Sequence, residues 1–279
     1  MDYKVYAIRY GLRHGGTRSA DFYLGDPHDG PQALTYYVWA IVGDDGRAYV
    51  VDAGFTPETA ARRPGKEVTC NPIEVLAALG VDAASQRDVI LTHLHFDHVG
   101  HYGAFPNARF WLQESEMAFW TGRYAGRDGY KRLVEPDDVL GLVALNFDSR
   151  VRFVDGRSSV APGITLHAVG GHSPGLQVVR VQTGSGVILL ASDAAHFYEN
   201  LESDRPFSVV HSLADMYGAF DRMRELVDSP SNIVPGHDPL VFERYPAASP
   251  DLEGYAVEIT PGESAAPGAS VHAATATPR

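Results

Sequence analysis

The sequence predicts an α/β fold in which two mixed β-sheets face each other and helices cover their outer faces. Short runs rich in β-branched and aromatic residues alternate with stretches that have a helical pattern of apolar residues. The strand-like runs come in two groups along the chain, and helices follow each group. A hydrophobic content of 44% and a charged content of 21% are ordinary for a globular protein that buries such layers.

The first group of predicted strands and helices occupies the N-terminal half. The expected strands are residues 5–9, 36–42, 48–52 and 88–92. Asp44-Asp45-Gly46 predicts a hairpin turn between the second and third of them. Asn71-Pro72 favours a helix start and Gly80 a helix end, so we expect a helix over residues 73–79. Residues 113–121 also have a helical pattern.

The second group follows a long polar segment. The expected strands are residues 151–154, 164–169, 176–182, 187–192 and 232–234. Between the last two, residues 216–227 place Met216, Phe220 and Met223 on one face of a predicted helix. Two groups of strands, each followed by helices, therefore predict two facing sheets with helices outside.

The chain length of 279 residues suits one large domain, and we expect it over residues 1–259. From about Thr260 the composition changes to Pro, Gly, Ser, Ala and Thr without large apolar side chains. Such a segment buries too little surface to order its backbone, so we expect residues 260–279 to be a mobile tail.

Composition also bounds the partners and the compartment. The formal net charge of −12 disfavours nucleic acid as a partner, because an acidic surface repels phosphate backbones. The single cysteine, Cys70, excludes an intrachain disulfide. Charges in the first residues argue against a secretory signal, and the apolar runs are far shorter than the ~20 residues of a membrane span. We therefore expect a cytoplasmic protein that binds no membrane.

A dense cluster of metal-binding residue types follows the predicted strand 88–92. It reads His93-Leu94-His95-Phe96-Asp97-His98. In an extended chain His93, His95 and Asp97 face one side, and His98 follows where Val99-Gly100 lets the chain turn. Three imidazoles and a carboxylate suit a borderline metal such as zinc. Without a metal, the same four groups would be costly if buried together.

Four further polar residues each come directly after a strand-like run. They are Asp52, His172, Asp193 and His237. Two glycines precede His172 and allow a close approach of the backbone. Taken singly, each residue is more typical of a turn or a surface. Together, at the same end of successive strands, they predict the second half of a metal site.

These residues resemble the ligand set of the metallo-β-lactamase superfamily, over most of residues 36–240. The resemblance implies a four-layer αβ/βα sandwich with two metal ions at one edge, most simply Zn²⁺, with Fe, Mn or Co as alternatives. It implies one metal on His93, His95 and His172. It implies the second on Asp97, His98 and His237, with Asp193 between them, and Asp52 supporting a ligand histidine.

The separations between the ligands resemble those of the N-acyl homoserine lactonases and related lactonases. The resemblance therefore implies an enzyme that opens a lactone by attack of a metal-bridging hydroxide, with Asp97 carrying the proton. The lactonases have a Tyr three residues after the bridging Asp, where this chain has His196. His196 is our candidate hydrogen-bond donor to the substrate oxygen, and Tyr198 is the alternative.

The substrate side of the site is predicted more loosely. Residues 11–31 form a long segment. The related lactonases place an N-terminal loop over the site, so the resemblance makes this segment a candidate active-site lid, and a surface-packed loop is an equal alternative. Aromatic residues and histidines of three segments are candidates for the pocket of a small lactone or related acyl substrate: Phe22, Tyr23, His28, Trp120, Tyr124, Phe207 and His211. The aromatic residues are equally consistent with core packing or with a contact in a homodimer.

Other functions remain open at the level of sequence. The same metal site would serve a hydrolase of another acyl bond, such as an ester, a lactam, a cyclic imide or a thioester. A flavodiiron-type redox protein would need acidic ligand substitutions and a flavin domain, and neither is seen here. A metal-binding module without catalysis is a third alternative, but such a protein would be expected to have lost some of the ligands.

Overall fold

The computed structural model describes residues 2–262, so most of the predicted tail over residues 260–279 lies outside the described residues. The strands are β1 (Tyr3–Arg13), β2 (Leu34–Gly43), β3 (Ala48–Val51), β4 (Lys66–Val68), β5 (Asp88–Ile90), β6 (Arg109–Gln113), β7 (Val151–Val154), β8 (Arg157–Ala161), β9 (Ile164–Ala168), β10 (Gln177–Thr183), β11 (Gly186–Ser192), β12 (Ile233–Pro235) and β13 (Ala256–Ile259).

The helices are mostly short. They are α1 (Arg18–Asp21), α2 (Pro57–Arg62), α3 (Pro72–Ala78), α4 (Phe96–Val99), α5 (Glu114–Trp120), α6 (Asp128–Lys131), α7 (Pro136–Phe147), α8 (Tyr198–Glu202), α9 (Leu213–Glu225) and α10 (Leu240–Arg244), with single 3₁₀ turns at Tyr102–Ala104, Pro230–Asn232 and Pro250–Leu252. Among the described residues, no helix is long and apolar enough to cross a membrane.

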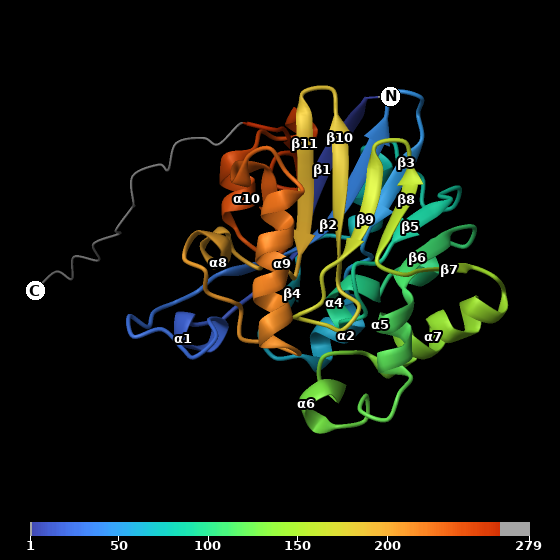
Figure 1. Ribbon diagram of the computed structural model, residues 1–279. Helices are drawn as coiled ribbons and strands as arrows, with labels where there is room; N and C mark the ends of the chain where they lie inside the picture. Colours follow the sequence, from blue (N-terminus) through green and yellow to red (C-terminus); the bar gives the residue numbers. More distant parts are fainter. Residues whose placement is uncertain (1, 263–279) are drawn as a thin grey trace, which may run out of the picture.

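Two β-sheets form the centre of the molecule, as the sequence predicts (Figure 1). The first has the order β13-β1-β2-β3-β5-β6-β7, with β4 also paired to β1. The second has the order β12-β11-β10-β9-β8. Each sheet combines parallel and antiparallel pairs, since β3, β5, β6 and β7 are parallel neighbours and β11 pairs parallel with β12.

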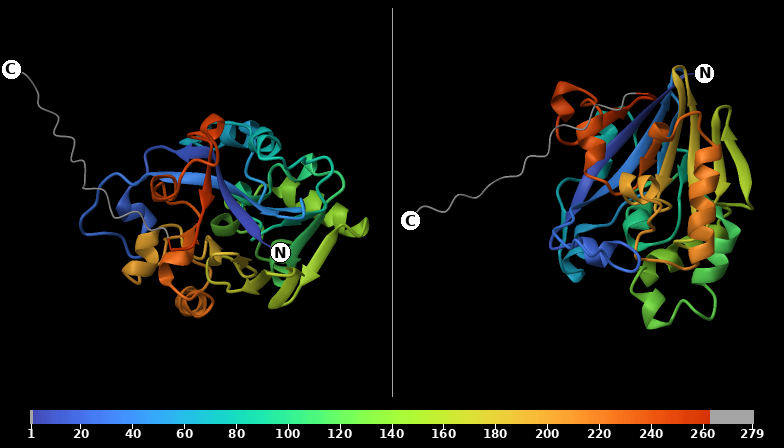
Figure 2. Two further views of the ribbon diagram at one scale, coloured as in Figure 1. Left: turned by 90° about the horizontal axis from the view of Figure 1, so that it is seen from above. Right: turned by 60° about the vertical axis from the view of Figure 1, so that its left-hand side comes forward.

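Alternating side chains divide the core into layers. Trp39 and Ile41 of β2 pack against Val179 and Leu190 of the second sheet, so these faces lie between the sheets. The outer face of the second sheet, including Leu189, packs against α9 (Figure 2). The outer face of the first sheet packs against α3, α5 and α7. The layers therefore run helix, sheet, sheet, helix, which confirms the predicted four-layer sandwich.

The local predictions are right for most strands and wrong in a few places. Gln113 closes strand β6 rather than starting a helix, which begins at Glu114. The segment read as polar contains α7, whose Val139 and Leu142 are buried. The segment read as a loop from residue 11 begins three residues later, at residue 14, because β1 continues to Arg13 and pairs there with both β2 and β4.

Candidate metal centre

The carboxyl ends of parallel strands bring the predicted ligands together. Asp52 and His93 follow β3 and β5, which are parallel neighbours in the first sheet. Asp193 and His237 follow β11 and β12, which are parallel neighbours in the second. His172 lies in the connection between β9 and β10. The site therefore forms at one edge of the sandwich, where the two sheets meet.

The local path of the HxHxDH cluster differs from the extended chain that the sequence predicts. His95 is extended, with φ −65° and ψ 155°, but the helix α4 starts at the next residue and carries Asp97 and His98. The Gly100 N–H donates to the Gly54 carbonyl at 2.6 Å, and a Cβ at Gly100 would lie 2.9 Å from that oxygen. Glycine at this position thus lets the chain turn away closely beneath the site.

Glycines before His172 also permit a tight approach. Gly170 and Gly171 have φ of +66° and +85°, which favour glycine. A Cβ on Gly171 would lie 2.6 Å from the Met216 nitrogen at the start of α9. The close approach that the sequence predicts here is therefore present, and it sets the loop of His172 against α9.

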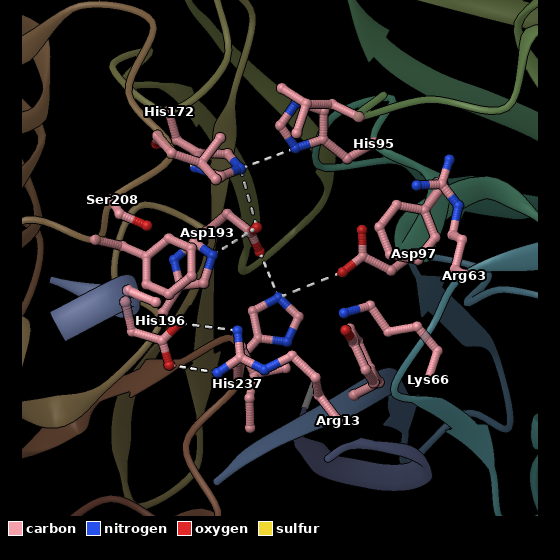
Figure 3. Close-up of a pocket in the computed structure, with 18 of the residues that line it drawn as sticks. Arg13, Arg63, Lys66, His95, Asp97, His172, Asp193, His196, Ser208 and His237 are labelled. Atoms are coloured by element: carbon pink, nitrogen blue, oxygen red, sulfur yellow. Dashed lines mark hydrogen bonds and ion pairs between the residues drawn. The ribbon is translucent and has the colours of Figure 1, made fainter. Parts of the chain in front are cut away.

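Asp193 lies at the centre of the ligand cluster (Figure 3). Its Oδ1 is 2.9 Å from His237 Nε2 and 3.2 Å from His98 Nε2. Its Oδ2 is 3.1 Å from Nε2 of both His172 and His196. Each oxygen of this buried carboxylate thus faces a different set of imidazoles.

The donor atoms fall into two groups on either side of Asp193. One contains His93, His95, His172 and Asp193, and the other contains Asp97, His98 and His237, with the atoms of each group within 4.8 Å of one another. A third group joins Asp193, His196 and His237. All these residues are buried, with exposed fractions of 0–8%.

The histidine tautomers point their free nitrogens into the cluster. His172 Nδ1 lies 2.9 Å from the Val209 carbonyl, and His237 Nδ1 lies 2.9 Å from the Thr35 carbonyl. A carbonyl only accepts, so both Nδ1–H groups donate and leave Nε2 with its lone pair. His98 Nδ1 lies 2.8 Å from Asp52 Oδ2, which is the supporting contact that the resemblance implies for Asp52.

The electrostatics of the cluster fit a cation. Burial lowers the pKa of His93 and His95 well below the usual range. Burial also opposes charge on His98, but the carboxylates of Asp193, Asp52 and Asp97 raise its pKa well above the usual value. His93 Nε2 is buried without a hydrogen-bond partner among the described residues, and His98 Nε2 faces Asp193 Oδ1. A metal ion would satisfy these lone pairs and balance Asp193.

Of the two candidates for the hydrogen-bond donor, His196 lies at the centre. Its ring stacks on Phe207 with a centroid separation of 3.5 Å. Burial lowers the pKa of His196 to about 3, so the ring is neutral. Tyr198 lies elsewhere: its ring packs between the sheets, with the guanidinium of Arg244 3.6 Å above it. The structure therefore brings His196 to the ligands and not Tyr198.

A cavity of about 410 Å³ opens above the ligands and is lined by His95, Asp97, His172, Asp193, His196 and His237. Of the predicted pocket residues only Phe207 lines it. Phe22 and Trp120 are buried behind the wall, while His28, Tyr124 and His211 are exposed and Tyr23 is half-buried. Ala20 and Asp21 bring the middle of the predicted lid segment to the edge of the cavity.

Several residues at the site were not predicted from the sequence. Glu116 is completely buried and accepts hydrogen bonds from the Leu94 and Gly175 N–H groups and the Ser173 hydroxyl. Lys66 and Arg63 line the cavity from β4 and the turn before it. The only sequence signal for Glu116 is that it is an acidic residue in an otherwise apolar stretch of the predicted helix, residues 116–120. Lys66 has no such signal, because it lies far from the motif in sequence.

Comparison with known proteins identifies the family to which this chain is similar. The sequence profile of the metallo-β-lactamase superfamily matches residues 29–237. The N-acyl homoserine lactonase of Bacillus cereus is 32% identical over 60% of this chain and 61% of its own length, so the matched part spans less than two thirds of that relative.

Two further comparisons extend over more of the chain. The N-acyl homoserine lactonase AttM of Rhizobium johnstonii is 27% identical over 88% of this chain and 97% of its own length. A crystal structure of a quorum-quenching N-acyl homoserine lactone lactonase superposes with a TM-score of 0.68 at 26% identity. That superposition covers 86% of this chain and 95% of the other.

Proposed function

Because this chain belongs to the metallo-β-lactamase superfamily, we propose that it is a metal-dependent hydrolase that opens a lactone, a cyclic ester. The observation that carries the proposal is the position of Asp193, whose two oxygens face two separate groups of donors. Such an arrangement suits a bridged pair of metal ions. Similarity to N-acyl homoserine lactonases supports a lactone as the substrate.

His93, His95 and His172 would hold one ion, and Asp97, His98 and His237 the other, with Asp193 between them. Zn²⁺ is the proposed metal, because imidazole and carboxylate donors at buried positions suit it. Two such ions supply an acidified water near neutral pH and a Lewis acid for the substrate carbonyl. We infer a cytoplasmic location for the enzyme.

Groups of the protein itself orient the candidate ligand histidines and transfer a proton. The carbonyls of Val209 and Thr35 and the carboxylate of Asp52 fix the ring orientations of His172, His237 and His98. Asp97 lines the cavity, and its Oδ2 lies 3.8 Å from Nε2 of both His98 and His237. We assign to Asp97 the transfer of a proton from the attacking water to the leaving alkoxide.

His196 is the proposed donor to the oxygen that becomes negative during attack. The ring is neutral and held flat against Phe207, so its orientation is fixed before substrate binds. Its single N–H is on Nε2, which lies 3.1 Å from the accepting Asp193 Oδ2, so the proposed donation to the substrate oxygen is from this Nε2–H group. The segment over residues 14–33 is the proposed lid, because Asp21 lies at the cavity edge and Arg18 ties it to α8.

Metal analysis and a substrate panel test the proposal. We expect two metal ions per purified chain and loss of activity after chelation. A panel of lactones, esters, lactams and thioesters at equal concentration should give the highest kcat/KM for a lactone. Preference for another acyl bond would replace the substrate class while leaving the metal centre intact, and a protein that binds no metal would overturn the proposal.

Asp97→Asn tests the proton transfer. We expect kcat to fall by roughly 10²-fold or more, because a carboxamide neither accepts nor releases the proton. Metal content should fall towards one ion per chain, because the second group also loses a carboxylate. Full activity with two ions bound would contradict the role of Asp97.

His196→Ala tests the donor. We expect kcat to fall by roughly 10²-fold with little change in metal content. Because removal of the ring also leaves space beside Phe207, His196→Tyr is the second variant, and it should recover part of kcat by restoring a donor. An unchanged kcat/KM in His196→Ala would exclude the donor role.

A further inference from the structure

One wall of the cavity above the ligands is rich in cationic side chains. Arg13, Arg63, Lys66 and Arg132 all line it. The whole chain, in contrast, has 35 acidic and 23 basic residues and a net charge of −12. Four basic side chains thus line the cavity that substrate would enter.

Two of these four cations have carboxylate partners. The Arg13 guanidinium donates to both oxygens of the buried Asp21. The Arg63 guanidinium donates to Glu135 at 2.9 Å and lies 3.9 Å above the Phe96 ring. Both arginines therefore have partners within the protein, although Arg63 shares Glu135 with Arg62.

Lys66 has no such partner. Its ammonium makes no hydrogen bond or ion pair with any described residue, although the side chain is half-buried. Lys66 lies opposite Arg13 in the pairing of β4 with β1, so the two side chains share one face of the sheet. Figure 3 shows the Lys66 ammonium directed into the pocket beside Asp97, between Arg13 and Arg63.

Arg132 is the second unpaired cation. Its side chain is exposed and makes no hydrogen bond or ion pair within residues 2–262. Arg132 is exposed and, like its neighbour Leu133, lines the cavity, so it lies at the mouth of the cavity. One unpaired cation thus lies in the wall and another at the entrance.

An unpaired, half-buried ammonium next to a second cation is unfavourable unless an anion joins it. Asp97 and Asp193 do not provide that anion in the loaded enzyme, because two divalent cations more than balance their two carboxylates. We propose that Lys66, assisted by Arg132, binds a carboxylate carried by the lactone substrate and so determines specificity. This inference rests on the proposed lactone hydrolysis.

The size of the cavity limits the substrate. A volume of about 410 Å³ is near the lower end for small-molecule sites. The remaining wall is formed by Leu34, Tyr36, Phe96, Leu133 and Phe207. The favoured substrate is therefore a small carboxylated lactone rather than a neutral lactone with a long acyl chain.

A matched pair of substrates tests the proposal directly. One is γ-butyrolactone with a carboxylate on the ring carbon next to the ring oxygen, and the other is its neutral carboxamide. Both present the same ester at nearly the same size. We expect the metal-loaded enzyme to prefer the carboxylate roughly tenfold or more in kcat/KM, mainly through KM.

Lys66→Gln should remove most of this preference, because it keeps polarity but loses the charge. Lys66→Arg should keep it, and Arg132→Gln should reduce it less. Lys131→Gln is the matched control, because Lys131 is an exposed lysine beside Arg132 that does not line the cavity. We expect Lys131→Gln to leave both rates unchanged.

Equilibrium binding separates this proposal from lactone hydrolysis itself. By calorimetry, the ring-opened hydroxy-dicarboxylate should bind the loaded protein more tightly than its monoamide, and Lys66→Gln should abolish the difference. That result without turnover of either lactone would refute hydrolysis but support the anion site. Equal kcat/KM of the native enzyme for both substrates, or a kcat/KM ratio between them that is unchanged in Lys66→Gln, would overturn the role of Lys66.

Discussion

Glu116 connects the two loops that carry most of the ligand histidines. Its carboxylate accepts from Leu94 N–H at 3.0 Å, beside His93 and His95, and from Gly175 N–H at 2.7 Å, beyond His172. It also accepts from Ser173 and from the Trp120 indole. A single buried side chain therefore keeps both loops in place without contacting the ligand cluster itself.

We expect Glu116→Gln to lower the free energy of unfolding by about 2–4 kcal/mol, because the amide turns a donor towards backbone N–H groups that need an acceptor. Metal affinity should fall as well. Denaturant unfolding and metal titration would measure both effects. Glu114→Gln, on the exposed face of the same helix, is the control, and equal stability of the two variants would contradict this role.

Individual residues differed in how well the sequence predicted them. The candidate ligand histidines and aspartates could be recognised because they follow strands in a dense motif, and the structure brings their donor atoms together in groups within 4.8 Å. Glu116, Lys66 and Arg63 were missed. Their roles depend on contacts between segments far apart in sequence, and composition and periodicity carry no information about such contacts.

At the level of elements, the loop after β1 is fastened to α8. The Arg18 guanidinium donates to Glu199 at 2.6 and 2.8 Å and to Asp26 at 2.7 and 3.0 Å. Arg205 reaches the same Asp26 at 3.1 Å. The two guanidinium groups lie 4.8 and 4.6 Å from the Phe22 ring. This network positions the segment whose Asp21 borders the cavity.

Arg18→Ala should loosen that segment. We expect several-fold faster proteolytic cleavage within residues 14–33 and a higher KM, because the segment forms one edge of the substrate cavity. Arg222→Ala is a suitable comparison, since Arg222 makes an exposed pair with Glu225 on α9. Cleavage rates that match in the two variants would show that the network does not restrain the loop.

Elements were predicted best where most of their residues are buried. Strands such as β10 and β11 have strong apolar patterns, and their predicted bounds are close to the observed ones. Strand β13 was not predicted, because its four residues pair with β1 from the far end of the chain. Helix α7 was hidden by the exposed Leu140 and Phe147 and by its acidic start.

For the whole molecule, acid should destabilise the fold partly through His167 of β9. Burial, together with the charges of nearby arginines, lowers the pKa of His167 to about 4. Between the unfolded value of 6.5 and about 4, the unfolded chain takes up the proton and the folded chain does not. Stability is therefore lost as the pH falls through this window, by at most about 1.4 kcal/mol per pH unit.

His167→Gln should remove this contribution while keeping a partner for the Thr165 hydroxyl, which lies 3.0 Å from His167. Unfolding of the metal-loaded proteins at several pH values measures the difference. Protonation of the metal ligands affects both proteins alike, so it cancels. Parallel stability curves between pH 6.5 and 4 would show that His167 does not titrate in this way.

Each sheet contributes only part of the set of candidate metal donors, and the two parts are unequal. His93, His95, Asp97 and His98 follow strands of the first sheet, and His172, Asp193 and His237 follow strands of the second. Thr92 and Ser192, one from each side, meet at 2.8 Å beneath them. A chain divided at the connection between β7 and β8 would leave neither fragment with both ligand groups. Metal uptake would then report whether two such fragments have reassembled, because the complete donor set forms only when both halves have docked.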